Sequence, residues 1–285
     1  MDTVVHVNAF PKTDDIVYPN EVLRIPGGSA ANVAVALVRL GADVSFLGTI
    51  GADADGQAIE QAFHSERVDT THLIRIPNGR TAGAFIAVNS KGDRVMYSLG
   101  GDAVYTDVSQ LTGIDFVADA LYIAEAFPEI GVTAAKRVRE CGGKVFFAPG
   151  GVMCGHGLEE LCPLIDCSDA MFVSLAELSA LTGQQDAAAG SAILLAAGTK
   201  SVVITQGSRG ASMHTQSNAF FLESKAVKAV DTTGAGDAFA GAYLFAELRG
   251  DEPMKCLAFA NRCAAFAVTK LGARTSPMFN EIEYE

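Results

Sequence analysis

Short apolar runs rich in β-branched residues alternate along this chain with longer, alanine-rich stretches of helical character. The short runs are apolar throughout, which predicts strands buried on both faces. We expect strands at 44–47, 120–123, 144–147, 170–173 and 201–205. We expect helices at 30–40, 55–66, 130–141, 157–165, 175–182, 186–197, 235–249 and 252–270. Strands that alternate with helices indicate right-handed crossovers and a mostly parallel sheet, hence an α/β fold.

Two regions, 3–25 and 80–99, depart from this rhythm because apolar and polar residues alternate along them. Such alternation is typical of antiparallel strands with one solvated face. Both regions are interleaved with the α/β part, so we expect them to project from it as a small sheet. The chain, residues 1–285, is therefore predicted to be a single domain.

Composition narrows the possible partners. No run approaches the ~18 apolar residues of a membrane span, and the start lacks the features of a secretory signal, so we expect a soluble protein with no membrane partner. The net charge of −12 argues against nucleic acid but allows a nucleotide. The six cysteines include no CxxC pair; a metal site of Cys154, Cys162, Cys167 and His156 is an alternative to reduced cytoplasmic thiols, which we favour.

The stretch Asp231-Thr-Thr-Gly-Ala-Gly-Asp237 directly precedes an alanine-rich helix. Glycines before a helix leave amide N–H groups uncovered, and the helix dipole adds positive charge there, so this turn can bind an anion. Asp237 lies in the same first turn, where it could be a common helix cap or a base that accepts a hydroxyl proton. A phosphoryl acceptor needs both parts, namely donors from Gly234, Ala235 and Gly236 and a base. The chain has no Walker A sequence and no protein-kinase HRD or DFG sequence.

Two long motifs in this chain resemble the signatures of the ribokinase family, also called the pfkB carbohydrate kinases. The first is Gly27-Gly-Ser-Ala-Ala-Asn-Val-Ala-Val-Ala-Leu-Val-Arg-Leu-Gly41, and the second begins at Asp231, about 200 residues later. The resemblance covers nearly the whole chain. It implies a ribokinase-like three-layer α/β/α fold with a small antiparallel β lid, a glycine-rich anion hole, and Asp237 as the catalytic base.

The resemblance also implies positions for the nucleotide and for Mg²⁺. The loop from Thr205 to Gly210, read from residues alone a hairpin turn, is similar to the family's nucleotide-binding loop. Residues implied to bind ATP are Ser174, Thr205, Gly207, Gly210, Gly236 and Asn261. Glu177 is implied to orient Mg²⁺ through water, although Ser174 stands where the family usually has Asn. Ala148 likewise replaces a common Asp, and helix capping by Ser174 with a surface Glu177 remains an alternative.

An activating monovalent cation, K⁺, is implied by the similarity of the C-terminal region to ribokinases. Several of the ligands would be main-chain carbonyls. The matching positions are Asp231, Thr233, Ala267, Lys270, Gly272 and Ser276. Lys270 and Gly272 could instead mark only a helix end.

A sugar would be bound by Asp2, Gly28, Asn32, Glu125 and Asp237, according to the same resemblance. Asn32 could instead be a buried amide bonded to backbone. In the family the counterpart of Asp2 ends the first core strand, whereas here only Met1 precedes it. We therefore expect this form to lack that strand, to expose a neighbouring strand edge, and to be less stable than a form extended by ~10 residues.

The sequence as a whole predicts an ATP-dependent kinase with Mg²⁺ that phosphorylates a terminal hydroxymethyl group, with D-ribose as the first choice of acceptor. A nucleoside kinase for inosine, guanosine, cytidine or adenosine is the alternative, with Phe85, Tyr97 or Phe127 as a shelf for the base. A non-catalytic sugar or nucleotide sensor is a further alternative, supported by Ser174, by Ala148 and by the missing first strand. A dinucleotide-dependent oxidoreductase lacks its GxGxxG turn. The lids of two copies would pack together in a homodimer.

Overall fold

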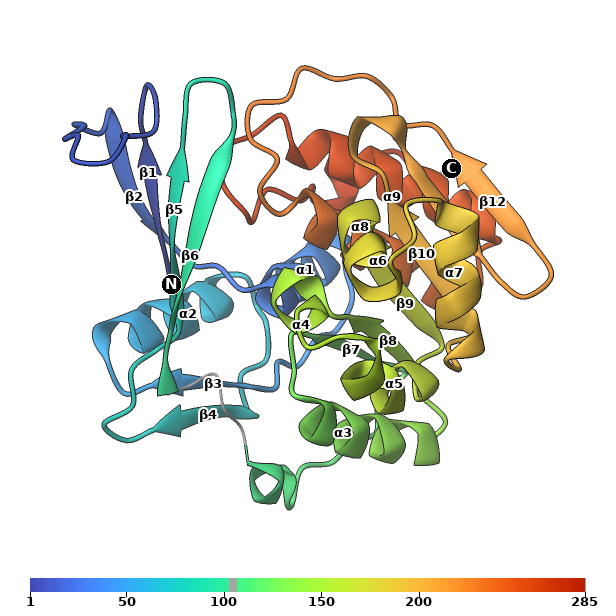
Figure 1. Ribbon diagram of the computed structural model, residues 1–285. Helices are drawn as coiled ribbons and strands as arrows, with labels where there is room; N and C mark the ends of the chain where they lie inside the picture. The colour runs from blue at the N-terminus through green and yellow to red at the C-terminus, as the bar shows by residue number, and fades with distance from the viewer. Residues whose placement is uncertain (103–106, 285) are drawn as a thin grey trace.

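The computed structural model describes residues 1–102 and 107–284, and its centre is a six-stranded sheet with helices on both faces (Figure 1). The strand order is β12-β11-β10-β9-β8-β7. β7 to β10 run parallel, and β11 and β12 continue the sheet antiparallel. The strands are β7 (Ala120–Ala124), β8 (Lys144–Ala148), β9 (Ala170–Ser174), β10 (Ser201–Thr205), β11 (Ala211–His214) and β12 (Ala219–Leu222).

Alternate residues of the parallel strands fill two separate cores. Phe146 and Phe172 point to one face, against α1 (Ser29–Leu40), α8 (Ala235–Leu248) and α9 (Pro253–Ala267). Their neighbours, such as Phe147, point to the opposite face. The helices on that side are α3 (Pro128–Glu140), α4 (Gly150–Cys154), α5 (Leu158–Asp166), α6 (Leu175–Thr182) and α7 (Ala187–Ala196). Burial on both faces explains the continuous apolar runs and confirms the predicted α/β class.

The predicted lid is a separate four-stranded sheet of order β2-β1-β5-β6, which stands beside the α/β body in Figure 1. Its two hairpins are antiparallel as expected, and the pair that joins them, β1 and β5, is parallel. The strands are β1 (Asp2–His6), β2 (Glu21–Ile25), β5 (Gly83–Val88) and β6 (Arg94–Gly100). Alternation shows which face of a strand is solvated, but it carries no information on the direction of a neighbour distant in sequence.

The strand expected at 44–47 is displaced. Within that run only Ser45 forms a bridge, to Asp69, whereas the strand itself is β3 (Gly48–Gly51), paired in parallel with β4 (Leu73–Ile76). Phe46 instead packs on Phe63 of α2 (Ala54–Ser65), with ring centroids 4.6 Å apart. The apolar run therefore serves helix packing. β3 and β4 form a sheet of their own, and among the described residues β7 is the edge of the six-stranded sheet.

The last helix is shorter than the predicted 252–270. α9 ends at Ala267. Its carbonyl accepts a hydrogen bond from the Thr275 hydroxyl at 3.0 Å, and Gly272 follows with a φ of 105°. These contacts turn the chain back toward α8. The described helices include none that is long and apolar enough to cross a membrane.

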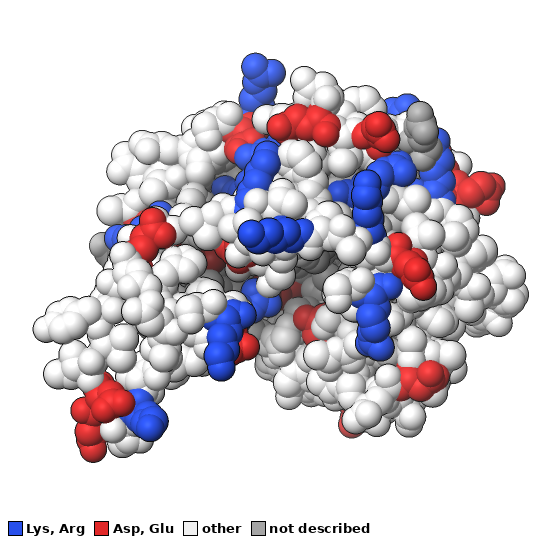
Figure 2. Space-filling view, turned by 90° about the horizontal axis from the view of Figure 1, so that it is seen from above, with Lys and Arg blue, Asp and Glu red and all other residues white. Residues whose placement is uncertain are grey.

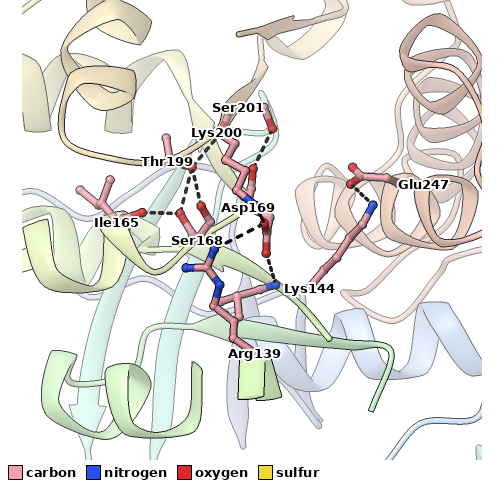
Figure 3. A network of polar contacts seen from close by, with 10 residues as sticks. Arg139, Lys144, Ile165, Ser168, Asp169, Thr199, Lys200, Ser201 and Glu247 are labelled. Carbon is pink, nitrogen blue, oxygen red and sulfur yellow. Dashed lines mark hydrogen bonds and ion pairs between the residues drawn. The ribbon is translucent and has the colours of Figure 1, made fainter. Parts of the chain in front are cut away.

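A polar network joins the amino ends of β8, β9 and β10 (Figure 3). Asp169 accepts hydrogen bonds from the Val145 amide at 2.8 Å and from the Lys200 ammonium at 2.5 Å, and Arg139 lies 3.9 Å away. Burial alone would raise the pKa of Asp169, but the bonds from Lys200 and Val145 outweigh it and lower that pKa below its ordinary value. The folded state therefore holds this group as a carboxylate.

We expect Asp169→Asn to lower the free energy of unfolding at pH 7 by about 1–2 kcal/mol, since the amide cannot pair with Lys200. Because the folded pKa lies below the unfolded one, the contribution is complete above the unfolded pKa, about 3.9, and is lost as the pH falls through the folded value. Urea unfolding at pH 7 and below pH 4 measures this. Asp43→Asn, at an exposed carboxylate, is the control. A deficit that stays constant with pH would contradict this assignment.

Candidate active site

Two helices begin side by side at the site, although they are about 200 residues apart in sequence. Gly28, with a φ of 93°, precedes α1, and Gly234, with a φ of 75°, precedes α8. Along these helices, a Cβ on Gly241 would lie only 2.8 Å from the Cβ of Ala36. The absence of a side chain at Gly241 therefore lets α1 and α8 pack closely enough for their first turns to meet.

Asp237 lies where the two first turns meet. Its Oδ1 accepts a hydrogen bond from the Ser29 hydroxyl, and its Oδ2 accepts one from Nδ2 of Asn32, both at 2.7 Å. Burial raises the pKa of Asp237, the bonds from Asn32 and Ser29 lower it, and the charge of Glu177 raises it; the net pKa lies above the ordinary value. A partly buried carboxylate with a raised pKa is a suitable general base.

Amides at the start of α8 face the same region. The amides of Gly234, Gly236 and Asp237 make no hydrogen bond to another residue that the structure describes, whereas the Ala235 amide donates to Thr232 O at 3.3 Å. The expected anion hole thus has Gly234 and Gly236 open, but Ala235 is engaged locally. Glycine is required at 234 because a Cβ there would lie 2.1 Å from Ala273 O.

Carboxylates converge around Asp237. Burial raises the pKa of Glu125, and the charges of Asp237, Glu177 and Asp2 raise it further, which reflects how closely these groups are gathered. Glu125 has a φ of 51°, unusual for a residue with a side chain. Gly150 leaves it room, because a Cβ there would lie 2.6 Å from Glu125 Oε1. Asp2 is placed beside the turn before α1, where only glycine fits at Gly27, since a Cβ would overlap the Asp2 carboxylate.

Figure 2 shows a hollow in the face of the molecule seen from above, with acidic side chains inside it and basic ones around its rim. Acidic groups inside such a hollow suit hydroxyls and hydrated cations, and basic groups at the rim suit phosphates. The hollow thus brings charged groups of both signs together on one face of the molecule.

Ser174 and Glu177 form a capping box at the start of α6. The Glu177 amide donates to the Ser174 hydroxyl at 3.2 Å, and the Ser174 amide donates to Oε2 of Glu177 at 2.7 Å. The Ser174 hydroxyl therefore caps the start of α6, as the helix-capping alternative expected. The other oxygen of Glu177, Oε1, forms no hydrogen bond or ion pair with another residue that the structure describes. Among the described residues no three side chains are placed to bind a metal directly, so a Mg²⁺ here fits only through water and phosphate oxygens.

The expected nucleotide loop joins β10 to β11, as the hairpin alternative anticipated. Gly207 and Gly210 both have positive φ angles, and a Cβ on Gly210 would lie 2.0 Å from Leu222 O. Leu222 O also accepts a hydrogen bond from Nδ2 of the buried Asn261 at 3.2 Å. Thr205, Gly207, Gly210 and Asn261 are thereby gathered at one end of the sheet.

The two loops expected to hold a monovalent cation are tied together. Asp231 accepts hydrogen bonds from the amides of Thr233 and Gly272, both at 2.9 Å. The buried Ser276 hydroxyl has no hydrogen-bond partner among the residues that the structure describes. Ala267 O fits less well because the Thr275 hydroxyl and the Lys270 amide already donate to it. The Lys270 ammonium points elsewhere, over the Phe266 ring.

Comparison with known proteins places this geometry in a family. The pattern of the pfkB family of carbohydrate kinases matches residues 1–279. The chain belongs to this family. It is a sugar or nucleoside kinase, an ATP-dependent phosphotransferase with an alcohol group as acceptor.

The relatives of this pfkB kinase differ in substrate. It is 31% identical to a ribokinase of Haemophilus influenzae, covering 96% of this chain and 91% of that protein. It is 33% identical to an aminoimidazole riboside kinase of Salmonella typhimurium, covering 91% and 87%. Its fold matches the structure of Arabidopsis thaliana ribokinase complexed with ribose and ATP, with a TM-score of 0.86 at 27% identity, over 98% of this chain and 93% of that one. These relatives share the family and the fold and act on different acceptors.

Three residues of this pfkB kinase site were not predicted from the sequence. Ser29 donates to Asp237, Arg274 contacts Asn32, and Tyr122 lies beside Ser29 with its pKa raised by burial and by the charge of Asp237. Ser29 directly follows the glycine pair of the first motif, so its position could have indicated it. Tyr122 and Arg274 carry no comparable signal, because their contacts arise only when distant segments pack.

Proposed function

We propose that this pfkB kinase transfers the γ-phosphate of ATP to the terminal hydroxymethyl group of a sugar, with D-ribose as the preferred acceptor. The observation that carries the proposal is the pair of 2.7 Å hydrogen bonds that hold both oxygens of Asp237 beside the open amides of α8. A fixed base next to anion-binding donors is the arrangement that phosphoryl transfer to an alcohol needs.

In the proposed reaction Asp237 takes the proton of the acceptor hydroxyl, and that oxygen attacks the γ-phosphorus in line. The amides of Gly234 and Gly236, with the dipole of α8, bind charge on the transferring phosphoryl group. Release of the Thr232 bond would add the Ala235 amide to these donors. Mg²⁺ bound with ATP would neutralise phosphate charge, and the free oxygen of Glu177 would orient one of its waters.

D-ribose as acceptor is supported by the polar character of the groups around Asp237. Asp2, Asn32 and Glu125 supply carboxylate and amide atoms that can bond vicinal hydroxyls, and the turn at Gly28 lets backbone approach closely. A nucleoside is the second candidate, favoured by one observation. Phe85 and Tyr97 of the lid lie with ring centroids 6.3 Å apart, and Tyr97 is 60% exposed, so a base could stack there.

We also propose that a monovalent cation, K⁺, binds between the two loops tied by Asp231. The unpartnered hydroxyl of buried Ser276 supports this proposal. A positive charge there would strengthen the nearby amides of α8 for an anion.

Pairing of two copies through the lid is a further part of the proposal. The lid and its connecting loop expose several large apolar side chains, among them Ile16 at 87%, Tyr18 at 86% and Met96 at 54%. A patch of such side chains on a monomer is typical of an interaction surface.

An acceptor panel tests the proposed reaction. We expect ADP release with ATP, MgCl₂ and D-ribose to exceed release without acceptor, and the kcat/KM for D-ribose to exceed that for fructose, adenosine, inosine and cytidine. A higher kcat/KM for a nucleoside would favour the second candidate. Failure of all five acceptors to raise ADP release would overturn both proposed acceptors, D-ribose and a nucleoside of this panel.

Replacing KCl with tetramethylammonium chloride at constant ionic strength tests the cation. We expect kcat to fall about ten-fold, since the cation strengthens donors to the transition state. Ser276→Ala should raise the K⁺ concentration needed for half-maximal rate. Ser191→Ala, at a buried hydroxyl in α7 bonded to Ala187 O, is the matched control and should leave it unchanged. Equal rates in the two salts would refute the cation site.

A further inference from the structure

Arg274 is a partly buried cation beside Asn32, and it forms no ion pair with another residue that the structure describes. It lies two residues before Ser276, and its guanidinium sits over the Phe63 ring at 5.2 Å. Burial lowers its pKa to about 10. A desolvated guanidinium is ordinarily compensated by a carboxylate, but no acidic group lies within ion-pair distance of it among the described residues. The charges of Glu66, Asp2 and Asp237 act on it only from farther away. The cost of burying this charge therefore calls for another explanation.

The Arg274 guanidinium bonds one amide and one main-chain carbonyl. Nε donates to Oδ1 of Asn32 and Nη2 donates to Gly27 O, both at 3.2 Å. These two nitrogens lie on the same edge of the planar group, so they hold the side chain of Asn32 and the turn before α1 in one fixed relation. The third nitrogen, Nη1, is buried with no partner.

The bond to Asn32 determines which end of its amide faces Asp237. Asn32 is only 7% exposed, so water does not readily replace a lost partner. With Oδ1 engaged by Arg274, Nδ2 is directed at Oδ2 of Asp237, to which it donates at 2.7 Å. A flipped amide would set its oxygen against the carboxylate, and the two acceptors would repel each other.

The main chain at Arg274 is fixed by hydrogen bonds from Arg39. The Arg39 guanidinium donates from Nη1 to the carbonyls of Arg274 and Ser276, at 2.8 and 2.9 Å. The same Arg39 forms a two-point ion pair with Glu66 at the end of α2. The backbone that carries Arg274 is thus fixed to α1 and α2 before its side chain reaches the site.

We propose that Arg274 is a positioning residue, which through Asn32 holds the carboxylate of Asp237 in the orientation needed to accept the substrate proton. It makes no hydrogen bond to Asp237 and acts on it through the Asn32 amide, while its charge has a smaller direct effect that lowers the pKa of Asp237. This inference rests on the proposed role of Asp237 as the base. It requires that removing Arg274 should shift the pKa of Asp237 more when Asn32 is present than when it is absent.

A double-mutant cycle tests this, with Arg274→Met, Asn32→Ala and the two combined. The first measurement is the pH titration of Asp237 in ¹³C-aspartate-labelled protein, with Asp237→Asn to assign the signal. Other groups that act on Asp237 are Ser29, Tyr122, Glu125 and Glu177, and all four are unchanged in the cycle. We expect Arg274→Met to raise the pKa of Asp237, and to add little in the Asn32→Ala background.

The second measurement is steady-state turnover of D-ribose and inosine. We expect Arg274→Met to lower kcat at least about ten-fold, to move the acidic limb of the pH profile upward, and to leave the KM for ATP unchanged. Arg137→Met is the matched control, because Arg137 also donates to a backbone carbonyl, Leu111 O, and lies over a ring, Phe116, but far from Asp237. It should change neither measurement.

The outcomes separate the two proposals. Failure of wild type to use any acceptor refutes the proposed function, while the titration still tests Arg274. An unchanged pKa of Asp237 in Arg274→Met would overturn the positioning role. Equal pKa shifts with and without Asn32 would overturn it too, and would mean that Arg274 acts on Asp237 directly by its charge. Should Arg274→Met not fold, Arg274→Lys keeps the charge without the planar fork. A raised pKa of Asp237 in Arg274→Lys supports the proposal, and an unchanged pKa of Asp237 in that variant refutes it.

Discussion

The site depends on one packing constraint, the close approach of α1 and α8. A Cβ on Gly241 would meet Ala36 at 2.8 Å, so these helices pack at nearly backbone contact. Their first turns then place Ser29 and Asn32 against the two oxygens of Asp237. A carboxylate so confined loses little freedom when a hydroxyl binds, and its raised pKa follows from the same burial. The positions of Asp237, of Ser29 and Asn32, and of the open amides of α8 all follow from this contact.

Much of the fold could be predicted because its signals are local. The apolar runs of β7 to β10 are buried on both faces, and glycines such as Gly28 and Gly234 occupy backbone conformations that few other residues adopt. Errors arose where an apolar run had a different role. Val44 and Phe46 pack in the cluster that contains α2, and within 44–47 only Ser45 forms a bridge. α9 ends early because Thr275, a residue of the following loop, bonds Ala267 O.

The site was predicted less completely than the fold, and the physical reason is the range of its contacts. Asp237 and Asn32 could be identified because each lies in a long motif. Arg274 and Tyr122 could not, since a polar side chain shows no pattern in sequence that tells which distant amide or hydroxyl it will meet. The engaged Ala235 amide likewise depends on a local hydrogen bond that motif similarity does not specify. The capping role of Ser174, in contrast, was an alternative that its residue type at a helix start already offered.

The role of Asp237 as the base is the central claim, and the variant Asp237→Asn tests it most directly. Asparagine keeps the size of the side chain and loses the proton acceptor, so nucleotide binding and phosphate transfer should separate. We predict that ATP binds this variant with a Kd close to that of wild type in calorimetry, while kcat with the preferred acceptor falls by about 10²–10⁴. Turnover near the wild-type rate, or loss of ATP binding together with turnover, would contradict the account.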